Sequence, residues 1–178
     1  CHNKYNRGPL QQRMRAMYTV LIADDEAIVR MMLSSMIDWD EMELKLAACV
    51  SNGREALAYL EQHPVDILIT DIQMPVIDGL ELIRRVKEFH TQPEILVLSA
   101  YNDFPYVRQA FKLGIYDYCL KREIHEEMLK RHLTNMKQLL SQKGRAQTSG
   151  AEQVKDRKQL LAQLLRGELE PETAGLPE

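Results

Sequence analysis

The chain is poor in cysteine and lacks any long apolar run. Its 178 residues include only Cys1, Cys49 and Cys119, without a CxxC pair, which argues against a disulfide framework and against a structural zinc site. No apolar run reaches the ~18 residues that a membrane span needs, and residues 1–16 lack the apolar core of a signal peptide. We therefore expect a reduced, cytoplasmic protein that does not associate with membranes.

An excess of positive charge is also missing. Lysine and arginine total 23 against 26 acidic residues, so the formal net charge is -3, and nothing in this balance indicates a surface that binds nucleic acid. The hydrophobic content of 45% is typical of a globular protein. Because domains commonly run about 100 to 150 residues, the length predicts one domain with an appendage.

The domain boundaries are predicted from where regular patterns begin and end. Residues 1–16 show no periodic apolar pattern, whereas Met17 opens directly onto a strand-like run. We predict that residues 1–16 are an N-terminal extension or an added remnant, and that residues 17–130 form the main domain. Residues 131–178 are expected to form a helical linker extension.

Short β-rich runs alternate with longer segments of helical period from Tyr18 onwards, which is typical of βαβ units. Strands are predicted at residues 18–23, 45–50, 66–70, 94–99 and 116–120. Apolar residues at helical spacing predict amphipathic helices between them. The apolar positions are Ile28, Met31, Met32 and Met36, then Ala56, Leu57 and Leu60, then Leu80, Leu82, Ile83 and Val86, then Val107, Ala110, Phe111 and Leu113. The methionines are expected to fill the core.

The predicted fold class is α/β, a doubly wound five-stranded parallel sheet flanked by five helices, with a C-terminal helical extension. The runs at residues 67–69 and 95–98 are apolar throughout, as expected of parallel strands that are buried on both faces. In such a sheet, ligands bind at the carboxyl ends of the strands, where the strand order changes direction. Candidate functional residues are therefore sought at these strand ends.

Reactive side chains occur at the ends of four of the five predicted strands. They are Asp24 and Asp25, Asp71, Ser99 and Lys121. Carboxylates that face one another raise one another's pKa values, so such a cluster is stable only with a cation among them. Mg²⁺ suits this donor set, because it prefers a few oxygen ligands and retains several waters. Lys121 supplies a second positive charge, and the Ser99 hydroxyl can donate to a phosphoryl oxygen.

Several segments, in the right order and on the right strand ends, together resemble the receiver domain of response regulators. The segments are Leu21-Ile22-Ala23-Asp24-Asp25-Glu26, Asp71-Ile72-Gln73-Met74-Pro75 with Asp78-Gly79, Ser99-Ala100 and Tyr118-Cys119-Leu120-Lys121. The resemblance covers about residues 17 to 130. It implies a flavodoxin-like (CheY-like) fold and a phosphorylation switch that catalyses only changes to its own phosphorylation, in place of a conventional metabolic enzyme.

The resemblance implies a role for each site residue. Asp71 would accept a phosphoryl group from the phosphohistidine of a sensor histidine kinase. Asp25, assisted by Asp24, would hold Mg²⁺ together with Asp71 and the main-chain carbonyl of Gln73. Lys121 would pair with the phosphoryl group. This chemistry relies on positioning and charge neutralisation.

The resemblance also implies a switch built from Ser99 and Tyr118. The hydroxyl of Ser99 would move toward the phosphoryl group, and the ring of Tyr118 would turn inward to fill the space. The surface over the fourth helix, the fifth strand and the fifth helix would change, and a homodimer is expected on phosphorylation. Such a change requires contacts that differ between the two states.

Taken alone, each site residue also has an ordinary structural interpretation. Asp24 could cap a helix that begins near Glu26, Ser99 could be a solvated strand end, and Lys121 could be an exposed cation. Tyr118 could be a core aromatic residue. Asp78-Gly79 is better explained as a turn and helix start. His125 and His132 suggest a metal site, but no third ligand accompanies them in the sequence.

Arg122 departs from the family pattern, because receivers usually carry proline directly after the lysine, often with a cis peptide bond. A cis bond before a residue other than proline costs roughly 2.5 to 4 kcal/mol, against about 0.5 to 1 before proline. A trans Lys121–Arg122 bond could displace Lys121 or weaken the switch. A degenerate receiver that never accepts phosphate therefore remains an alternative.

A finer resemblance is to receivers that precede AraC-type helix-turn-helix regulators in Gram-positive bacteria. It rests on Asp38-Trp39, Ser51-Asn52-Gly53-Arg54-Glu55-Ala56-Leu57 and Ser99-Ala100-Tyr101-Asn102-Asp103-Phe104. It implies control of transcription by a DNA-binding module that is absent from this chain. The alternative is a stand-alone receiver that acts through protein contacts only.

The segment after Lys121 carries a second helical pattern. Leu129, Leu133, Met136 and Leu140 recur at the spacing of a coiled-coil seam, which favours self-association. The alternative is a fifth helix that packs its apolar face on the sheet up to about Leu133. A polar break at 143–150 and a second short helix around 154–165 are also predicted.

Overall fold

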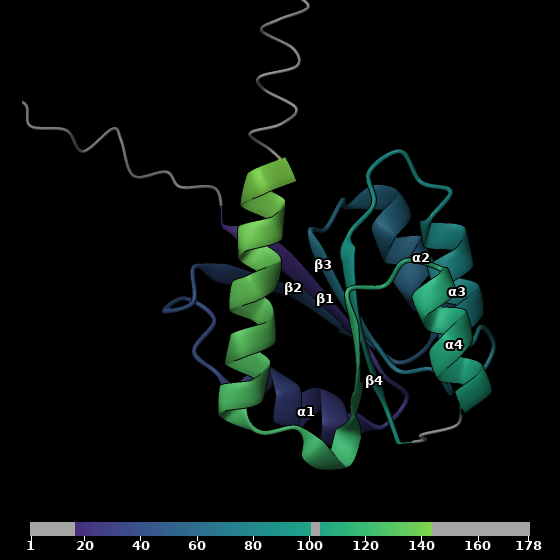
Figure 1. Ribbon diagram of the computed structural model, residues 1–178, viewed down its shortest axis with the longest axis horizontal. Coiled ribbons are helices and arrows are strands. Elements are labelled where there is room, and N and C mark those ends of the chain that lie inside the picture. Colours follow the sequence, from purple (N-terminus) through teal and green to yellow (C-terminus); the bar gives the residue numbers. More distant parts are fainter. Residues whose placement is uncertain (1–16, 101–103, 144–178) are drawn as a thin grey trace, which may run out of the picture. The chain divides into compact units, whose positions relative to one another are not determined.

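The structure is a computed structural model that describes residues 17–100 and 104–143. Its centre is a five-stranded parallel sheet with the strand order β2-β1-β3-β4-β5 (Figure 1). The strands are β1 (Tyr18–Ala23), β2 (Leu44–Val50), β3 (Ile67–Thr70), β4 (Glu94–Ser99) and β5 (Asp117–Leu120). Each predicted strand is confirmed, with its bounds moved by no more than one residue.

Helices connect the strands in sequence. They are α1 (Ala27–Met36), α2 (Gly53–Gln62), α3 (Gly79–Val86) and α4 (Phe104–Lys112), and a 3-10 turn, η2 (Lys121–Glu123), follows β5. A fifth helix begins at residue 126 and is described to residue 143. The predicted α/β fold with five helices is confirmed. In the described part of the chain, no helix is both long and apolar enough to cross a bilayer.

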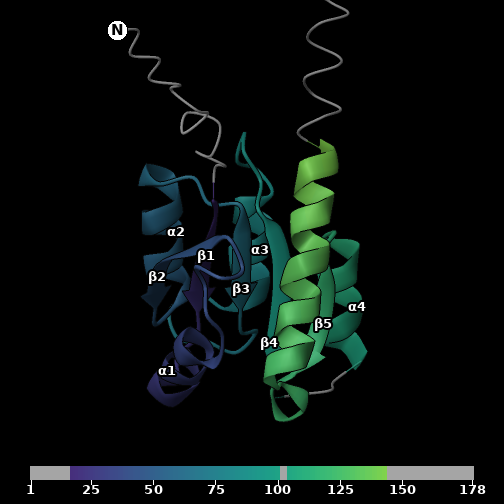
Figure 2. The same ribbon diagram turned by 90° about the vertical axis from the view of Figure 1, so that its left-hand side faces the viewer.

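The sheet is buried on both faces (Figures 1 and 2). On one face, α2, α3 and α4 pack against strand residues such as Leu21, Leu68 and Val97. The alternate strand residues, which point to the other face, are fully buried as well, and α1 and the fifth helix lie on that side. The continuous apolar runs of β3 and β4 therefore have the predicted cause.

The apolar face of α1 was predicted wrongly. Val29 and Leu33 are its buried residues, whereas Ile28 and Met31 are 68% and 65% exposed and Met32 is exposed as well. The valine and leucine of this segment recur at helical spacing, and so do its methionines, so the sequence offers two possible apolar stripes. Packing on the sheet selects the stripe of Val29 and Leu33. Met31 and Met32 therefore do not fill the core.

The fifth helix also corrects an expectation. Contacts divide the chain into residues 1–137 and 138–178, and the helix up to residue 137 belongs to the first unit. Within that unit Leu129, Leu133 and Met136 are buried, so they do not form an exposed coiled-coil seam. The helix runs through residue 130, the predicted end of the main domain. The predicted break and second helix at 143–165 lie almost wholly outside the described residues.

Side chains cap the starts of α2 and α3, and a close backbone contact fixes the start of α3 after β3. The side chains of Asn52 and Asp78 accept hydrogen bonds from the backbone N–H groups of Glu55 and Glu81, so each caps a helix. A Cβ at Gly79 would lie 2.0 Å from the carbonyl oxygen of Asp71. The predicted turn and helix start at Asp78-Gly79 is thus what the structure shows, and glycine is required because α3 begins against the backbone of Asp71.

Replacing Gly79 with alanine should destabilise the fold by about 3 kcal/mol, because the new Cβ overlaps backbone atoms and the helix start must move. Urea unfolding followed by circular dichroism measures this loss. Gly114→Ala is the matched control, since Gly114 has open space around it but a φ of +73°. Its cost should be only about 1 kcal/mol, the ordinary strain of a left-handed residue. Equal losses for the two variants would contradict the close-contact explanation.

Candidate functional site

The strand order changes direction between β1 and β3, and two aspartates lie at that point. The backbone N–H of Asp71 donates to the carbonyl of Ala23 at 2.9 Å, and that of Asp24 donates to the carbonyl of Val50 at 3.1 Å. These bonds extend the sheet by one residue beyond each strand, so both aspartates are held as rigidly as strand residues. They lie at the edge of the sheet where the sequence predicts a site.

Lys121 joins the ends of β1 and β3 to the end of β5. Its Nζ lies 2.8 Å from Asp24 Oδ2, 2.8 Å from Asp71 Oδ2 and 2.8 Å from Glu26 Oε1, and its side chain is 10% exposed. The described residues contain no cis peptide bond, so the Lys121–Arg122 bond is trans. Lys121 reaches Asp71 all the same, and the displacement considered for a trans bond does not occur.

Asp71 is buried and makes two strong contacts. Only 4% of the residue is exposed; its Oδ1 accepts the backbone N–H of Ile72 at 2.6 Å, and its Oδ2 accepts Lys121 Nζ at 2.8 Å. Burial raises the pKa of Asp71 above the ordinary aspartate value, although the hydrogen bond and charge of Lys121 oppose the rise. The site therefore holds its central carboxylate in an environment that disfavours negative charge.

The surroundings favour the charged form of Lys121, whereas they disfavour the charged form of Asp71. Burial alone lowers the pKa of this lysine, but the hydrogen bonds to Asp24, Asp71 and Glu26 outweigh burial and raise its pKa above the ordinary value. Lys121 is therefore a permanent cation at neutral pH. Its position beside Asp71 places a fixed positive charge where a phosphoryl group on Asp71 would carry negative charge.

The acidic side chains around Asp71 form a compact cluster. One carboxylate oxygen from each of Asp24, Asp25, Glu26 and Asp71 lies within 4.8 Å of the others. Asp24 is buried and accepts the backbone N–H of Glu26 at 2.9 Å, while Asp25 is exposed. Glu26 is the N-cap residue of α1, so Asp24 supports the helix start without being its cap.

Sequence reasoning assigned no role to Glu26 or Arg30. Glu26 is the third carboxylate on Lys121, and Arg30 donates to the backbone carbonyls of Asp24 and Asp25 at 2.6 and 3.0 Å. The signal for Glu26 was available, since it directly follows the aspartate pair. The sequence indicated Arg30 less clearly, because its contacts require the Arg30 side chain to reach back from the first turn of α1 to the loop before the helix.

A pocket of about 480 Å³ opens beside the acidic cluster. Asp25 and Gln73 line it together with Pro75 and Tyr106. Gln73 is exposed, and the pocket places it on the same side of the site as Asp25. The predicted use of the Gln73 carbonyl as a metal ligand stays a prediction.

The loop after Gln73 is strained at one residue. Val76 has a φ of +71°, which is rare for a β-branched residue, and the N–H of Ile77 donates to the carbonyl of Pro75 across it at 2.8 Å. Ile77 in turn accepts the backbone N–H of Gly53 at 3.2 Å. The contact with α2 holds this loop in place on one side of Asp71.

The two predicted switch residues lie on neighbouring strands. Ser99 ends β4 and is fully buried, so it is not a solvated strand end. Tyr118, in β5, is half-buried and packs against the core on the α3 and α4 side. Val97 and Tyr118 pair across the two strands, as do Ser99 and Leu120. The predicted movement of Ser99 and Tyr118 stays a prediction.

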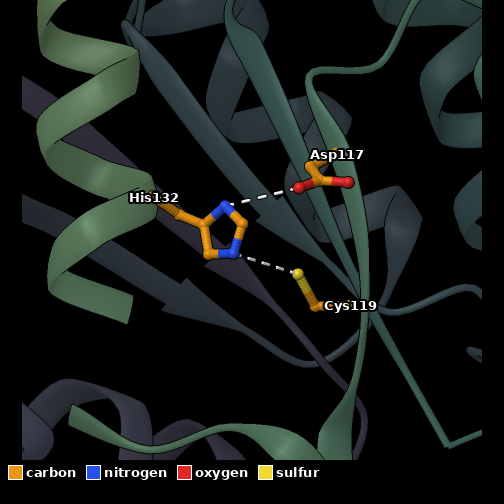
Figure 3. Close-up of side chains that lie close together, drawn as sticks. All are labelled: Asp117, Cys119 and His132. Carbon is orange, nitrogen blue, oxygen red and sulfur yellow. Dashed lines mark hydrogen bonds and ion pairs between the residues drawn. The ribbon is translucent and has the colours of Figure 1, made fainter. Parts of the chain in front are cut away.

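Sequence reasoning also missed a cluster away from the acidic site. His132 was said to lack accompanying ligands, yet Asp117 and Cys119 lie beside it (Figure 3). The three residues come from β5 and from the fifth helix, and their proximity depends on how that helix packs. His125 is exposed and is not part of this cluster.

Comparisons with known proteins agree on the family. The family model described as "Response regulator receiver domain" matches residues 20–134. The uncharacterized transcriptional regulatory protein YesN of Bacillus subtilis is 37% identical over 105 residues, 59% of this chain and 28% of the relative. The transcriptional regulatory protein HptR of Staphylococcus aureus is 33% identical over 136 residues, 75% of this chain and 53% of the relative.

A solved structure supports the same assignment. The REC domain of AraT, a response regulator from Geobacillus stearothermophilus, has a TM-score of 0.67 and 35% sequence identity, and covers 72% of this chain and 98% of its own. The chain spans about half or less of the length of the curated relatives that it matches. On these matches and on the fold, the chain belongs to the response regulator receiver family of two-component systems.

Proposed function

We propose that Asp71 accepts a phosphoryl group from a sensor histidine kinase and that the chain is a phosphorylation-controlled switch. The observation that carries this proposal is the contact between Lys121 Nζ and Asp71 Oδ2 at 2.8 Å in a buried, acidic site at the strand ends. A buried carboxylate beside a fixed cation is a suitable nucleophile, because the cation compensates the charge that arrives with the phosphoryl group.

The donor set fits Mg²⁺. Asp24, Asp25, Glu26 and Asp71 bring four carboxylates together, and Lys121 supplies one ammonium group. These charges do not balance, and oxygen donors of this kind are the ligands that Mg²⁺ prefers. We propose Asp24, Asp25 and Asp71 as ligands, with the carbonyl of Gln73. Bound Mg²⁺ would neutralise part of the charge on the phosphoryl oxygens.

The residues of the chain perform the remaining steps. A carboxylate oxygen of Asp71 forms a bond to phosphorus while the bond between phosphorus and the kinase histidine breaks, and the electron pair of that bond stays on the histidine. Lys121 is already placed to pair with the transferred group, and the Ile72 N–H holds Oδ1 of Asp71 in position. Most of the rate then comes from positioning and charge. Besides this transfer, we propose one further reaction of the chain, the hydrolysis of its own aspartyl phosphate.

The kinase must bring its histidine close to Asp71, so it must cover the surface around the site. Ile28 and Met31 of α1 are largely exposed and lie within one or two turns of Asp25. An apolar surface of this kind supports docking of a protein partner beside the acidic cluster. We propose the cytoplasm as the place of this encounter.

We propose that phosphorylation changes the face formed by α4, β5 and the fifth helix, with Ser99 and Tyr118 as the moving residues. Ser99 is buried at the end of β4 and pairs with Leu120, the residue directly before Lys121. Tyr118 is only half-buried, so an inward turn of its ring would remove more apolar surface from water. The consequence that we propose is homodimerisation through this face.

The proposed output is control of transcription through an AraC-type helix-turn-helix module outside these 178 residues. The support comes from relatives that are named transcriptional regulatory proteins and that extend well beyond the matched region. The second candidate is a receiver that acts through protein contacts alone, which the same site chemistry would serve.

Incubation with acetyl phosphate and Mg²⁺ is expected to add the mass of one phosphoryl group to the intact chain, because Asp71 and Lys121 are already in contact. Intact-mass spectrometry measures the gain. Asp71→Asn should gain nothing, whereas Asp40→Asn, which changes an exposed aspartate far from the site, should gain as much as the wild type. Chelation of Mg²⁺ should prevent the reaction. A wild-type chain that never gains this mass would defeat the proposed function.

Replacing Lys121 with methionine should lower the free energy of unfolding by about 3 kcal/mol, because three carboxylates lose their shared cation and two of them are buried. Chemical denaturation at pH 7 measures the loss, and Lys130→Met on the surface should change stability little. Adding Asp71→Asn should restore part of the stability.

The loss caused by Lys121→Met should shrink as the pH falls. Asp71 has a raised pKa, so the native state binds its proton at a higher pH than the unfolded chain does. Its ionised form therefore costs stability at neutral pH, and acidification toward about pH 4 removes that cost. A loss that is independent of pH would show that Lys121 stabilises the fold through packing alone.

Beryllofluoride with Mg²⁺, which mimics an aspartyl phosphate, should convert a monomer to a dimer in size-exclusion chromatography with light scattering. The expected reason is the rearranged face around Tyr118. Asp71→Asn should stay monomeric under the same conditions. If a chain that accepts phosphate keeps the molar mass of a monomer in light scattering, dimerisation is contradicted. The phosphorylation proposal would stand.

A further inference from the structure

β5 and the fifth helix enclose a second group of reactive side chains, separate from the acidic site (Figure 3). Asp117 and Cys119 are two residues apart on β5, so both point to the face that the helix covers. His132 projects from the helix between them. Its Nε2 lies 3.5 Å from Cys119 Sγ, and its Nδ1 lies 3.5 Å from Asp117 Oδ2.

The histidine of this cluster is buried without full compensation. His132 is 9% exposed and Cys119 is 8% exposed. Among the side chains that the structure describes, His132 Nδ1 is the buried polar atom that makes no hydrogen bond, although Asp117 lies near it. An uncompensated buried nitrogen destabilises the fold and needs an explanation. Leucine or alanine in its place would avoid that cost.

The geometry matches that of a transition-metal site. A tetrahedral zinc ion with Zn–S of about 2.3 Å and Zn–N of about 2.0 Å separates its sulfur and nitrogen ligands by about 3.5 Å. Cys119 Sγ and His132 Nε2 have this separation. A histidine that binds a metal through one nitrogen usually donates its other N–H to a carboxylate, which fixes the ring. Asp117 Oδ2 lies 3.5 Å from that second nitrogen, so a small movement would bring the two atoms into a hydrogen bond.

We propose that Asp117, Cys119 and His132 form a binding site for a divalent transition-metal ion of the zinc class. Cys119 Sγ and His132 Nε2 are the ligands, and in the metal-bound state the Nδ1–H of His132 donates a hydrogen bond to Asp117, which is a positioning residue. Water completes the coordination, and it can enter beside Asp117, whose side chain is 39% exposed. The site joins β5 to the fifth helix.

The protonation states define the reaction of binding. Burial raises the pKa of Cys119 to about 11, with Asp117 and Glu123 adding to the rise, and burial lowers the pKa of His132. At neutral pH the thiol is therefore protonated and the imidazole is neutral. When the ion binds, the S–H bond breaks, the sulfur–metal bond forms and one proton leaves to solvent. His132 keeps its proton on Nδ1.

The site differs in chemistry from the cluster around Asp71. Sulfur and imidazole select zinc-class ions, whereas the carboxylates of Asp24, Asp25 and Asp71 suit Mg²⁺. The acidic carboxylates follow β1 and β3, whereas Asp117 and Cys119 lie within β5, and metal binding by the thiol site does not depend on phosphorylation. Saturating Mg²⁺ should therefore fill the acidic site and leave the thiol site open.

Titration with Co²⁺, a spectroscopic substitute for zinc, tests the site directly. The experiment uses a variant of the full chain with Cys1→Ser and Cys49→Ser, in which Cys119 is the single thiol. Mg²⁺ is present in excess. We expect a sulfur-to-cobalt charge-transfer band that saturates at one ion per chain and disappears when Zn²⁺ is added. Zn²⁺ should also raise the melting temperature, because it binds the native state.

Matched variants assign the ligands. Cys119→Ser should abolish the band, and His132→Gln should weaken Co²⁺ binding by at least about tenfold. Asp117→Asn should weaken it about 10- to 100-fold, as expected of a residue that orients a ligand. Asp71→Asn should leave the band unchanged, because Asp71 belongs to the other site.

The proposal is overturned if the single-thiol chain shows no charge-transfer band at excess Co²⁺, since that chain retains both ligands. It is also overturned if the band survives Cys119→Ser. This serine variant nearly keeps the size of the side chain, and circular dichroism checks its fold, so the test does not rest on the more disruptive change at His132. A cluster that is only a hydrogen-bonded pair would give neither the band nor the rise in melting temperature.

Discussion

The ammonium group of Lys121, shared among three carboxylates, is the interaction on which the geometry of the acidic site depends. Neighbouring strands are about 4.8 Å apart, so β5 lies nearly 10 Å from β3, with β4 between them. A side chain that starts at the end of β5 must pass over the end of β4 to reach Asp71. Lysine is long enough for this span, and its ammonium group contacts Asp71 directly. Ser99 ends β4, the strand that lies between β3 and β5.

This arrangement is costly to the fold. Two buried carboxylates and a buried ammonium group lose hydration that their mutual attraction does not always repay, and the raised pKa of Asp71 shows that its negative charge remains disfavoured. An apolar core at this edge would be more stable. The charges are better explained by chemistry than by stability, and the rigid backbone around Asp71 serves the same purpose. Gly79 allows α3 to start against that backbone, and Val76 accepts a strained φ in the loop that follows.

The fold and the centre of the site could be predicted from the sequence because both depend on local patterns. Strands buried on both faces give continuous apolar runs, and Asp71 directly follows one of them. Predictions failed where tertiary packing decides. Two helical stripes compete in α1, and only contact with the sheet selects Val29 and Leu33. The trans bond after Lys121 was a reason to doubt its position, yet the side chain reaches Asp71 with the trans backbone geometry.

The cluster of Asp117, Cys119 and His132 was missed for a related reason. Sequence spacing reveals metal ligands when they share a turn or a helix face, but here the third residue comes from a helix whose register against β5 no local pattern specifies. Because side chains alternate along a strand, Asp117 and Cys119 face the fifth helix while Tyr118 faces α4. Four residues of β5 thus serve both faces of the sheet and lead directly into Lys121. An ion that joined β5 to the fifth helix would hold the strand from the side opposite Tyr118. It would restrain the backbone of the proposed switch without occupying the space into which the tyrosine ring is proposed to turn.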